Sequence, residues 1–211
     1  MPRKKTGLSK VVTRKRPTQE RSRDTVDKLL NVTEQLLEDP GLDRLTTVLI
    51  AKKAGLSVGT LYEYFPNKQS VLFALASRWI DKMENLMADN DVSQREYSSW
   101  AEWYESYARS MLELYQQDKG LVRYYDMLVS VLELRELDLK LDAMVEQYLT
   151  RSLRHFFPDL LPEDVEIMNR MIITNMHNVL RWAVNMPEPQ RSRMLGNLHF
   201  LIQSLILKNA C

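Results

Sequence analysis

The chain has 211 residues and a mass of 24.8 kDa, enough for one large domain or for a small domain fused to a mid-sized one. Apolar residues make up 45% and charged residues 27%, which excludes an intrinsically disordered protein. The net charge is +1 but unevenly spread, because residues 1–25 carry nine Lys or Arg and two Asp or Glu. This basic segment indicates a polyanionic partner, or else a solvated tail that only improves solubility.

Other classes are excluded by what the sequence lacks. Cys211 is the single cysteine and the three histidines are scattered, so we expect no disulfide, no metal site and no cofactor. No nucleophile and base are suitably spaced and no glycine-rich phosphate loop occurs, so we expect no catalytic residues and no enzyme. Apolar runs are far shorter than the roughly 18 residues of a membrane span, and no secretory signal follows the basic start. We expect a cytoplasmic protein without membrane contact.

The first elements in chain order are an arm and three helices. Residues 1–17 show no sustained periodicity of apolar residues and are predicted to form a flexible basic arm. Apolar residues at helical spacing predict a helix from about 19 to 38. Thr46 is predicted to cap a short helix that ends at Gly55, and a second short helix is expected over 58–64.

Longer helices are expected beyond this point. One runs from about 67 to 88, where apolar residues form a stripe. Another starts at a possible capping box of Ser99 and Glu102 and is broken at Gly120. Residues 121–157 give one or two helices.

The last part of the chain completes an all-α pattern. Residues 137–142 alternate with period two, as a strand does, but leucine favours helix and no partner strand is visible. We interpret this stretch as a boundary between helices. The final helices are expected at about 163–184, opened by Pro162, and at 190–208. The total is about nine helices.

The stretch 45–68, LTTVLIAKKAGLSVGTLYEYFPNK, has the dimensions of a helix-turn-helix. Leu61 and Phe65 would be buried, which leaves the polar side of the second helix exposed to enter a major groove. Gly59 early in that helix lowers helix stability, which makes sense if the backbone must lie close to a sugar-phosphate strand. The alternative is a plain corner of two helices inside a bundle, and the adjoining basic arm favours DNA binding.

These residues resemble the DNA-binding region of the TetR (tetracycline repressor) family of bacterial transcriptional regulators. The resemblance covers about 50 residues, roughly 21–72. The matching residues are Thr46, Ile50, Ala51, Ala54, Gly55, Leu56, Ser57, Gly59, Thr60, Leu61, Tyr62, Tyr64, Phe65 and Lys68. The resemblance implies a basic arm over 1–17, a DNA-binding domain over 18–66, and an effector-binding and dimerisation domain over 67–211.

The resemblance also implies contacts with double-stranded DNA, in which phosphate contacts position the protein and base contacts specify the site. The expected DNA-binding residues are Arg14, Arg16, Thr46, Thr47, Ser57, Val58, Gly59, Thr60, Tyr62, Tyr64 and Lys68. Arginines of the arm would neutralise phosphates or enter a minor groove. Two residues depart from the family pattern, because Val58 replaces a common polar residue and Val48 a frequent arginine. Val58 contacts a thymine methyl or contributes nothing.

The remaining chain is rich in methionine and aromatic residues, which at helical spacing usually form core. Their number exceeds what a small core needs, and the resemblance implies a cavity for a small apolar or aromatic effector. The expected ligand-binding residues are Trp79, Met83, Trp103, Tyr107, Met111, Tyr124, Tyr125, Asp126, Met144 and Tyr148. Asp126 beside two tyrosines would suit a cationic ligand, or it is a solvated or salt-bridged acid.

The last two predicted helices carry apolar residues on two sides, one for the subunit core and one for a second copy. The residues predicted at a homodimer interface are Ile172, Val179, Leu198, Leu201 and Leu205. Three functional hypotheses remain. The chain is a repressor that an effector releases from a palindromic operator, a DNA-bound adaptor regulated by a protein partner, or a helical enzyme or ligand carrier without DNA binding.

Overall fold

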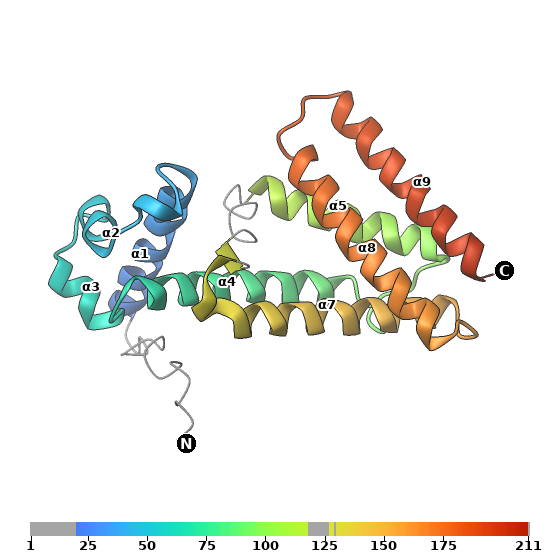
Figure 1. The fold of residues 1–211 in the computed structure, drawn as a ribbon, viewed down its shortest axis with the longest axis horizontal. Helices are drawn as coiled ribbons and strands as arrows, with labels where there is room; N and C mark the ends of the chain where they lie inside the picture. The colour runs from blue at the N-terminus through green and yellow to red at the C-terminus, as the bar shows by residue number, and fades with distance from the viewer. Residues whose placement is uncertain (1–19, 118–126, 129, 211) are drawn as a thin grey trace, which may run out of the picture. The chain divides into compact units, whose positions relative to one another are not determined.

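The computed structural model describes residues 20–117, 127, 128 and 130–210. Within these ranges it contains eight α-helices and two short 3-10 turns, and no strand (Figure 1). The predicted all-α fold is therefore confirmed. None of the described helices combines the length and the apolar character needed to cross a bilayer. Several residues predicted from the sequence lie outside the described ranges, namely Arg14 and Arg16 of the arm, Tyr124, Tyr125 and Asp126.

The described residues form two compact units, each with its own core. The first unit contains the described residues of 1–81 and 120–139, and the second contains those of 82–119 and 140–211. Two helices, α4 (Lys68–Asp89) and α7 (Arg135–Phe156), each contribute residues to both units.

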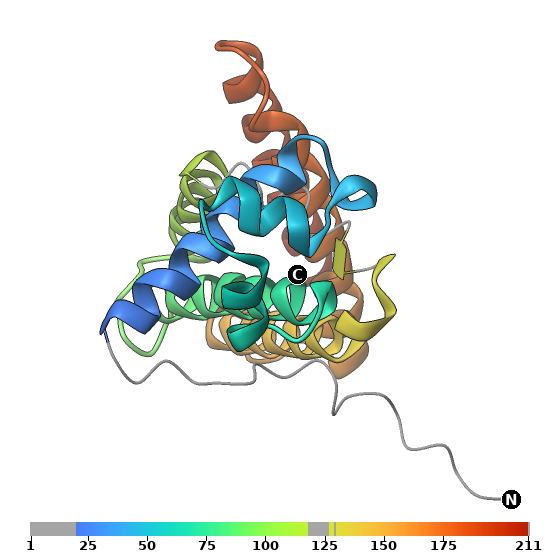
Figure 2. The same cartoon turned by 90° about the vertical axis from the view of Figure 1, so that its left-hand side faces the viewer.

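The first unit contains three helices ahead of α4, which Figure 2 shows facing the viewer. They are α1 (Glu20–Glu38), α2 (Thr47–Lys53) and α3 (Val58–Tyr64), with the 3-10 turn η2 (Leu42–Arg44) after α1. α2 contacts both α1 and α3. The core is formed by side chains with no exposed surface, among them Leu29, Ile50, Leu61 and Phe65. On the surface of this unit, the Arg78 guanidinium of α4 pairs with Glu34 of α1 at 2.9 Å.

The second unit is built around three helices that contact one another pairwise (Figure 1). They are α5 (Trp100–Gln117), α8 (Pro162–Ala183) and α9 (Gln190–Ala210). α8 begins with proline at its first position and two acids in its first turn, as predicted, because proline needs no hydrogen bond there and acids favour the positive end of the helix dipole.

The period-two stretch 137–142 lies inside a helix, so its interpretation as a helix boundary was wrong. It belongs to α7 (Arg135–Phe156), which follows the 3-10 turn η3 (Leu132–Leu134). Leu137 and Leu141 are buried one helical turn apart, whereas the intervening Leu139 is exposed. Asp138 is buried next to Leu137 because its carboxylate is paired with Arg135 at 2.9 Å. A carboxylate paired with a largely exposed arginine thus occupies one of the buried positions of this helix.

Candidate nucleic-acid interface

Both ends of α2 are fixed by local hydrogen bonds. Thr46 is its N-cap, as predicted, and its Oγ1 accepts a hydrogen bond from the backbone N–H of Leu49 at 3.1 Å. At the other end Gly55 adopts a φ of 65°, and the backbone N–H of Leu56 donates to the carbonyl of Ala51 at 2.9 Å. This is a Schellman motif, which needs a residue with positive φ and therefore favours glycine. The turn that leads into α3 is consequently tightly defined.

α3 begins at a second capped end. Ser57 Oγ accepts a hydrogen bond from the backbone N–H of Thr60 at 2.9 Å, and the two side-chain hydroxyls also bond to each other at 2.9 Å. Leu61 is completely buried, so α3 is held against the rest of the unit along one side. Ser57 and Gly59 are exposed at the start of the helix. The first turn of α3 therefore presents hydroxyls and backbone to the outside.

Gly59 is not required by the packing of the chain itself. A Cβ atom built at this position would meet only Ser57 Oγ, at an ordinary contact distance of 3.5 Å. The residue lies within α3 and its φ is not positive. Neither the space around this position nor its backbone conformation therefore demands glycine within the chain itself.

Further polar side chains of the predicted set lie around α3. The hydroxyls of Tyr62 and Thr47 bond to each other at 3.1 Å, and Tyr62 remains exposed. The ammonium group of Lys68 donates to the carbonyl of Leu42 at 3.4 Å. Tyr64 instead points back into the unit, where its hydroxyl accepts a hydrogen bond from Ser22 of α1 at 3.2 Å. The two departures from the family pattern differ, because Val48 exposes 58% of its surface whereas Val58 is half-buried.

Three residues of the predicted effector site pack against one another in the second unit. The rings of Trp103, Tyr107 and Tyr148 lie with their centroids 5.2–5.8 Å apart. The indole N–H of Trp103 and the hydroxyl of Tyr148 both donate to the carbonyl of Asn90, at 3.0 and 3.1 Å. Burial raises the pKa of both tyrosines, so their hydroxyls stay protonated. We call these three rings the aromatic cluster.

The other described members of that predicted site are placed as follows. Trp79 and Met83 are buried on α4, Met111 is buried on α5, and Met144 is half-buried on α7. A cavity of about 430 Å³ lies elsewhere in the second unit, between α5, α8 and α9. None of its lining residues was predicted from the sequence as a ligand contact. The one available signal was Gly196, a glycine in the middle of the last predicted helix.

The predicted dimer residues on α8 and α9 divide into two groups. Ile172 and Leu198 are buried in the core of the unit, while Val179 and Leu205 are half-buried and Leu201 is exposed. Five other large apolar side chains on the same helices are exposed and were not predicted: Ile167, Met171, Trp182, Phe200 and Leu207. We refer to these five and Leu201 as the exposed apolar face.

Comparisons with known proteins match two parts of the chain. Residues 29–75 match a model described as "Bacterial regulatory proteins, tetR family", and residues 99–204 match "Tetracyclin repressor-like, C-terminal domain". The nucleoid occlusion factor SlmA of Haemophilus ducreyi is 28% identical over 110 residues, which are 52% of this chain and 51% of that protein. The chain thus matches only about half the length of this curated relative.

Solved structures share the fold over most of the chain. A transcriptional regulator from Rhodococcus sp. Rha1 has a TM-score of 0.72 at 14% identity, covering 88% of this chain and 98% of that one. The fatty acid degradation regulator FadR from Bacillus halodurans has a TM-score of 0.65 at 22% identity, covering 89% and 96%.

Proposed function

The chain belongs to the TetR family of bacterial regulatory proteins, and from this premise we propose that α2 and α3 bind a duplex DNA operator. It is a transcriptional regulator and not an enzyme. The observation that carries the proposal is the start of α3, where Gly59 has no internal contact that would explain it. Backbone without a side chain can approach a sugar-phosphate strand closely. Because operators lie on the chromosome, the proposal places the protein in the cytoplasm.

The predicted contacts divide into residues that would bind phosphates and position the protein, and residues that would contact bases and specify the sequence. Thr46, Thr47 and Lys68 flank α3 and Tyr62 lies within it, and these four residues would bind phosphates. Ser57, Val58 and Thr60 lie at the start of α3 and would reach base edges in the major groove. The arm residues Arg14 and Arg16 would add affinity through phosphates or the adjacent minor groove. Tyr64 would contribute through its hydrogen bond to α1, which orients the end of α3.

Replacing Gly59 by alanine tests the close approach of α3 to DNA. Alanine stabilises a helix by up to about 1 kcal/mol relative to glycine, and its Cβ meets nothing closer than 3.5 Å in the protein. The variant should therefore fold at least as stably as the native chain. Operator affinity should nevertheless fall by about tenfold or more, equivalent to about 1.4 kcal/mol, because the methyl group meets the DNA. Fluorescence anisotropy with the DNA upstream of the protein's own gene measures the affinity.

Gly196→Ala on α9, measured without added ligand, is the matched control, since a Cβ there meets nothing within 4 Å. This variant should bind the same DNA with native affinity. Native affinity in Gly59→Ala would instead remove the observation on which the DNA interface rests.

Replacing Lys68 by alanine should weaken binding to every duplex and reduce the slope of log affinity against log salt by about one, because one phosphate contact is lost. Lys140→Ala removes the same charge from α7 in the second unit and should leave the slope unchanged. A native slope in Lys68→Ala would show that this ammonium group holds no phosphate. The measurement is a salt titration of the anisotropy signal.

We propose further that the chain acts as a homodimer through α8 and α9. The exposed apolar face supports this, because large apolar side chains gathered on two neighbouring helices are unfavourable in water. A two-fold dimer carries two α3 helices, so its operator would be roughly palindromic, with half-sites about one helical turn or a multiple apart. Ile172 and Leu198 would support this face from the core, and Val179 and Leu205 would lie at its edge.

The proposed regulation is repression that ends when a small apolar or aromatic effector binds the second unit. The residues predicted from the sequence for this effector include the aromatic cluster together with Tyr124, Tyr125 and Asp126, and the charge of Asp126 would favour a cationic effector. Coupling is reciprocal, so operator DNA must weaken effector binding by the factor by which effector weakens operator binding. Titrations of each ligand with and without the other measure both factors.

The second candidate is a DNA-bound adaptor whose signal is another protein. Two observations favour it, namely the similarity to a nucleoid occlusion factor and the packing of the aromatic cluster against itself. An adaptor keeps its DNA affinity in the presence of every small molecule that binds it. A ligand that binds the protein and releases it from the operator would therefore favour the repressor over the adaptor.

A further inference from the structure

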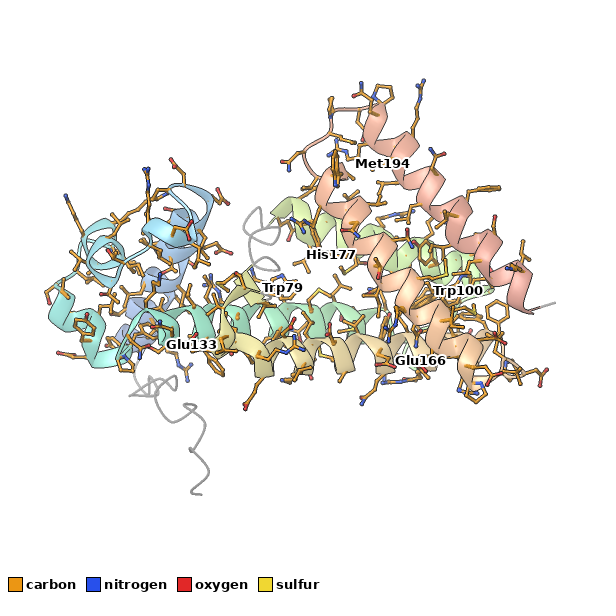
Figure 3. All side chains as sticks on the ribbon, viewed as in Figure 1. Trp79, Trp100, Glu133, Glu166, His177 and Met194 are labelled. Atoms are coloured by element: carbon orange, nitrogen blue, oxygen red, sulfur yellow. The ribbon has the colours of Figure 1, made fainter. Side chains whose placement is uncertain are left out.

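The cavity between α5, α8 and α9 has the size and lining of a small-molecule site. Its volume of about 430 Å³ lies within the range of roughly 300–1,000 Å³ that is typical of ligand pockets. Met176 and Leu180 come from α8, and Met176 directly precedes His177, which is labelled in Figure 3. Ala108 and Leu112 come from α5, and Leu195 and Leu198 from α9. All six side chains are apolar, so an apolar body is favoured inside.

Gly196 on α9 also lines this cavity, and nothing in the protein explains a glycine there. It lies in the middle of a 21-residue helix, where glycine is disfavoured. A Cβ atom at this position would find nothing within 4 Å, so no neighbouring element requires the missing side chain. Gly196 is exposed and borders the cavity, so a larger residue there would narrow its opening. The glycine is thus accounted for if the cavity has to stay open.

The polar side chains around the cavity include the strong hydrogen-bond donor Arg109. The Arg109 guanidinium has five N–H groups and pairs with Glu105 through Nη2 at 2.9 Å. The hydroxyl of Tyr104 is buried without a hydrogen-bond partner among the described residues, and the ring of His199 lies 5.7 Å from the Tyr104 ring. The Tyr104 hydroxyl and the His199 ring can each donate or accept, and the Glu105 carboxylate is already bonded to Arg109. The N–H groups of Arg109 that Glu105 does not use are charged donors, so an incoming carboxylate is favoured.

We infer that this cavity binds an amphiphilic carboxylate, with its apolar body between α5, α8 and α9 and its carboxylate on Arg109. A planar guanidinium binds a carboxylate through two parallel hydrogen bonds, whereas an ammonium group would be repelled by it. None of the three rings of the aromatic cluster lines this cavity. The inference rests on the proposed regulation by a small effector. It places that effector in this cavity instead of at the residues predicted from the sequence, and it names the effector's chemical class.

Three probes of equal chain length test the site by isothermal titration calorimetry of the full-length protein without DNA. They are dodecanoate, dodecanol and dodecyltrimethylammonium, each below the concentration at which it forms micelles. Dodecanoate should bind with one site per chain, dodecanol about tenfold more weakly, and the ammonium compound most weakly. If the ammonium compound binds as well as dodecanoate, the assignment of a carboxylate is overturned.

Two variants locate the binding. Gly196→Leu should reduce dodecanoate affinity at least about tenfold by obstructing the cavity. Asn197→Leu places the same side chain at the next position, which is also exposed but does not line the cavity, and should not reduce the affinity. Arg109→Gln should weaken dodecanoate about tenfold and leave dodecanol unchanged. Its control is Arg170→Gln on α8, which removes a similarly exposed arginine of an ion pair with Glu166. Native dodecanoate affinity in Gly196→Leu would overturn the site.

Sedimentation measures the oligomeric state and tests whether the cavity is a ligand site or part of an interface between two copies of the chain. If Gly196→Leu changes the state without any ligand, while no probe binds the native chain, the cavity is covered by a second copy and the inference fails. Operator binding is measured separately. If dodecanoate binds as expected but operator affinity is unchanged, the site stands and the proposed release by an effector fails.

Discussion

Leu201→Glu should convert the proposed dimer into a monomer and lower operator affinity by about 10²- to 10⁴-fold. The leucine on α9 exposes 46% of its surface in the single chain, so glutamate there leaves the subunit core intact. In a dimer the same position would bury an unpaired carboxylate, which is strongly unfavourable. The two α3 helices of a dimer would bind one operator together. A monomer therefore loses the affinity that the second α3 helix contributes. Sedimentation and anisotropy measure the two effects.

Leu139→Glu is the matched control, since this leucine on α7 is 51% exposed and lies outside the exposed apolar face. It should leave both the sedimentation and the operator affinity unchanged. A dimeric Leu201→Glu variant would place the interface on another surface.

Trp103→Ala should lower the free energy of unfolding by about 3–5 kcal/mol, the largest stability loss we expect from a single substitution. The side chain has no exposed surface, and its ring lies 4.7 Å from Trp100 and 5.5 Å from Tyr107. Its removal leaves a cavity that the neighbouring helices can fill only in part. The carbonyl of Asn90 also loses one of its two donors. Urea denaturation followed by circular dichroism measures the change.

Trp103→Phe separates packing from hydrogen bonding, because it keeps an aromatic ring and deletes the N–H group. The decrease in the free energy of unfolding should be smaller than for Trp103→Ala, about 1–2 kcal/mol. If Trp103→Ala is as stable as the native chain and instead loses affinity for aromatic ligands, the aromatic cluster is a binding site and not core.

The helix-turn-helix could be predicted closely because its determinants are local in sequence. Thr46, Gly55 and Ser57 fix helix ends through hydrogen bonds within three to five residues. The predicted range 58–64 for α3 agrees with the structure residue by residue. Capping and turn formation need no information from distant parts of the chain, so the sequence alone sufficed.

The second unit could be predicted less well because its interactions join distant residues. Asn90 at the end of α4 receives hydrogen bonds from Trp103 and Tyr148, which lie 13 and 58 positions away. Arg151 pairs with the buried Asp91 across 60 positions. Burial raises the pKa of Asp91, but the hydrogen bonds from Ser93 and the positive charge of Arg151 together outweigh burial and lower it. Periodicity predicts which residues are apolar. It does not distinguish aromatic side chains that fill a core from those that line a cavity.

The four tryptophans give this protein an optical property that follows from their burial. Trp79, Trp100 and Trp103 are buried, whereas Trp182 on α8 exposes 67% of its surface. Indole emission shifts to longer wavelength in water, so Trp182 should supply the red component of the fluorescence and be the component that iodide quenches. Trp182 also belongs to the exposed apolar face. A second copy docked there would shift its emission to the blue and shield it from iodide, so assembly could be followed on dilution without any attached label.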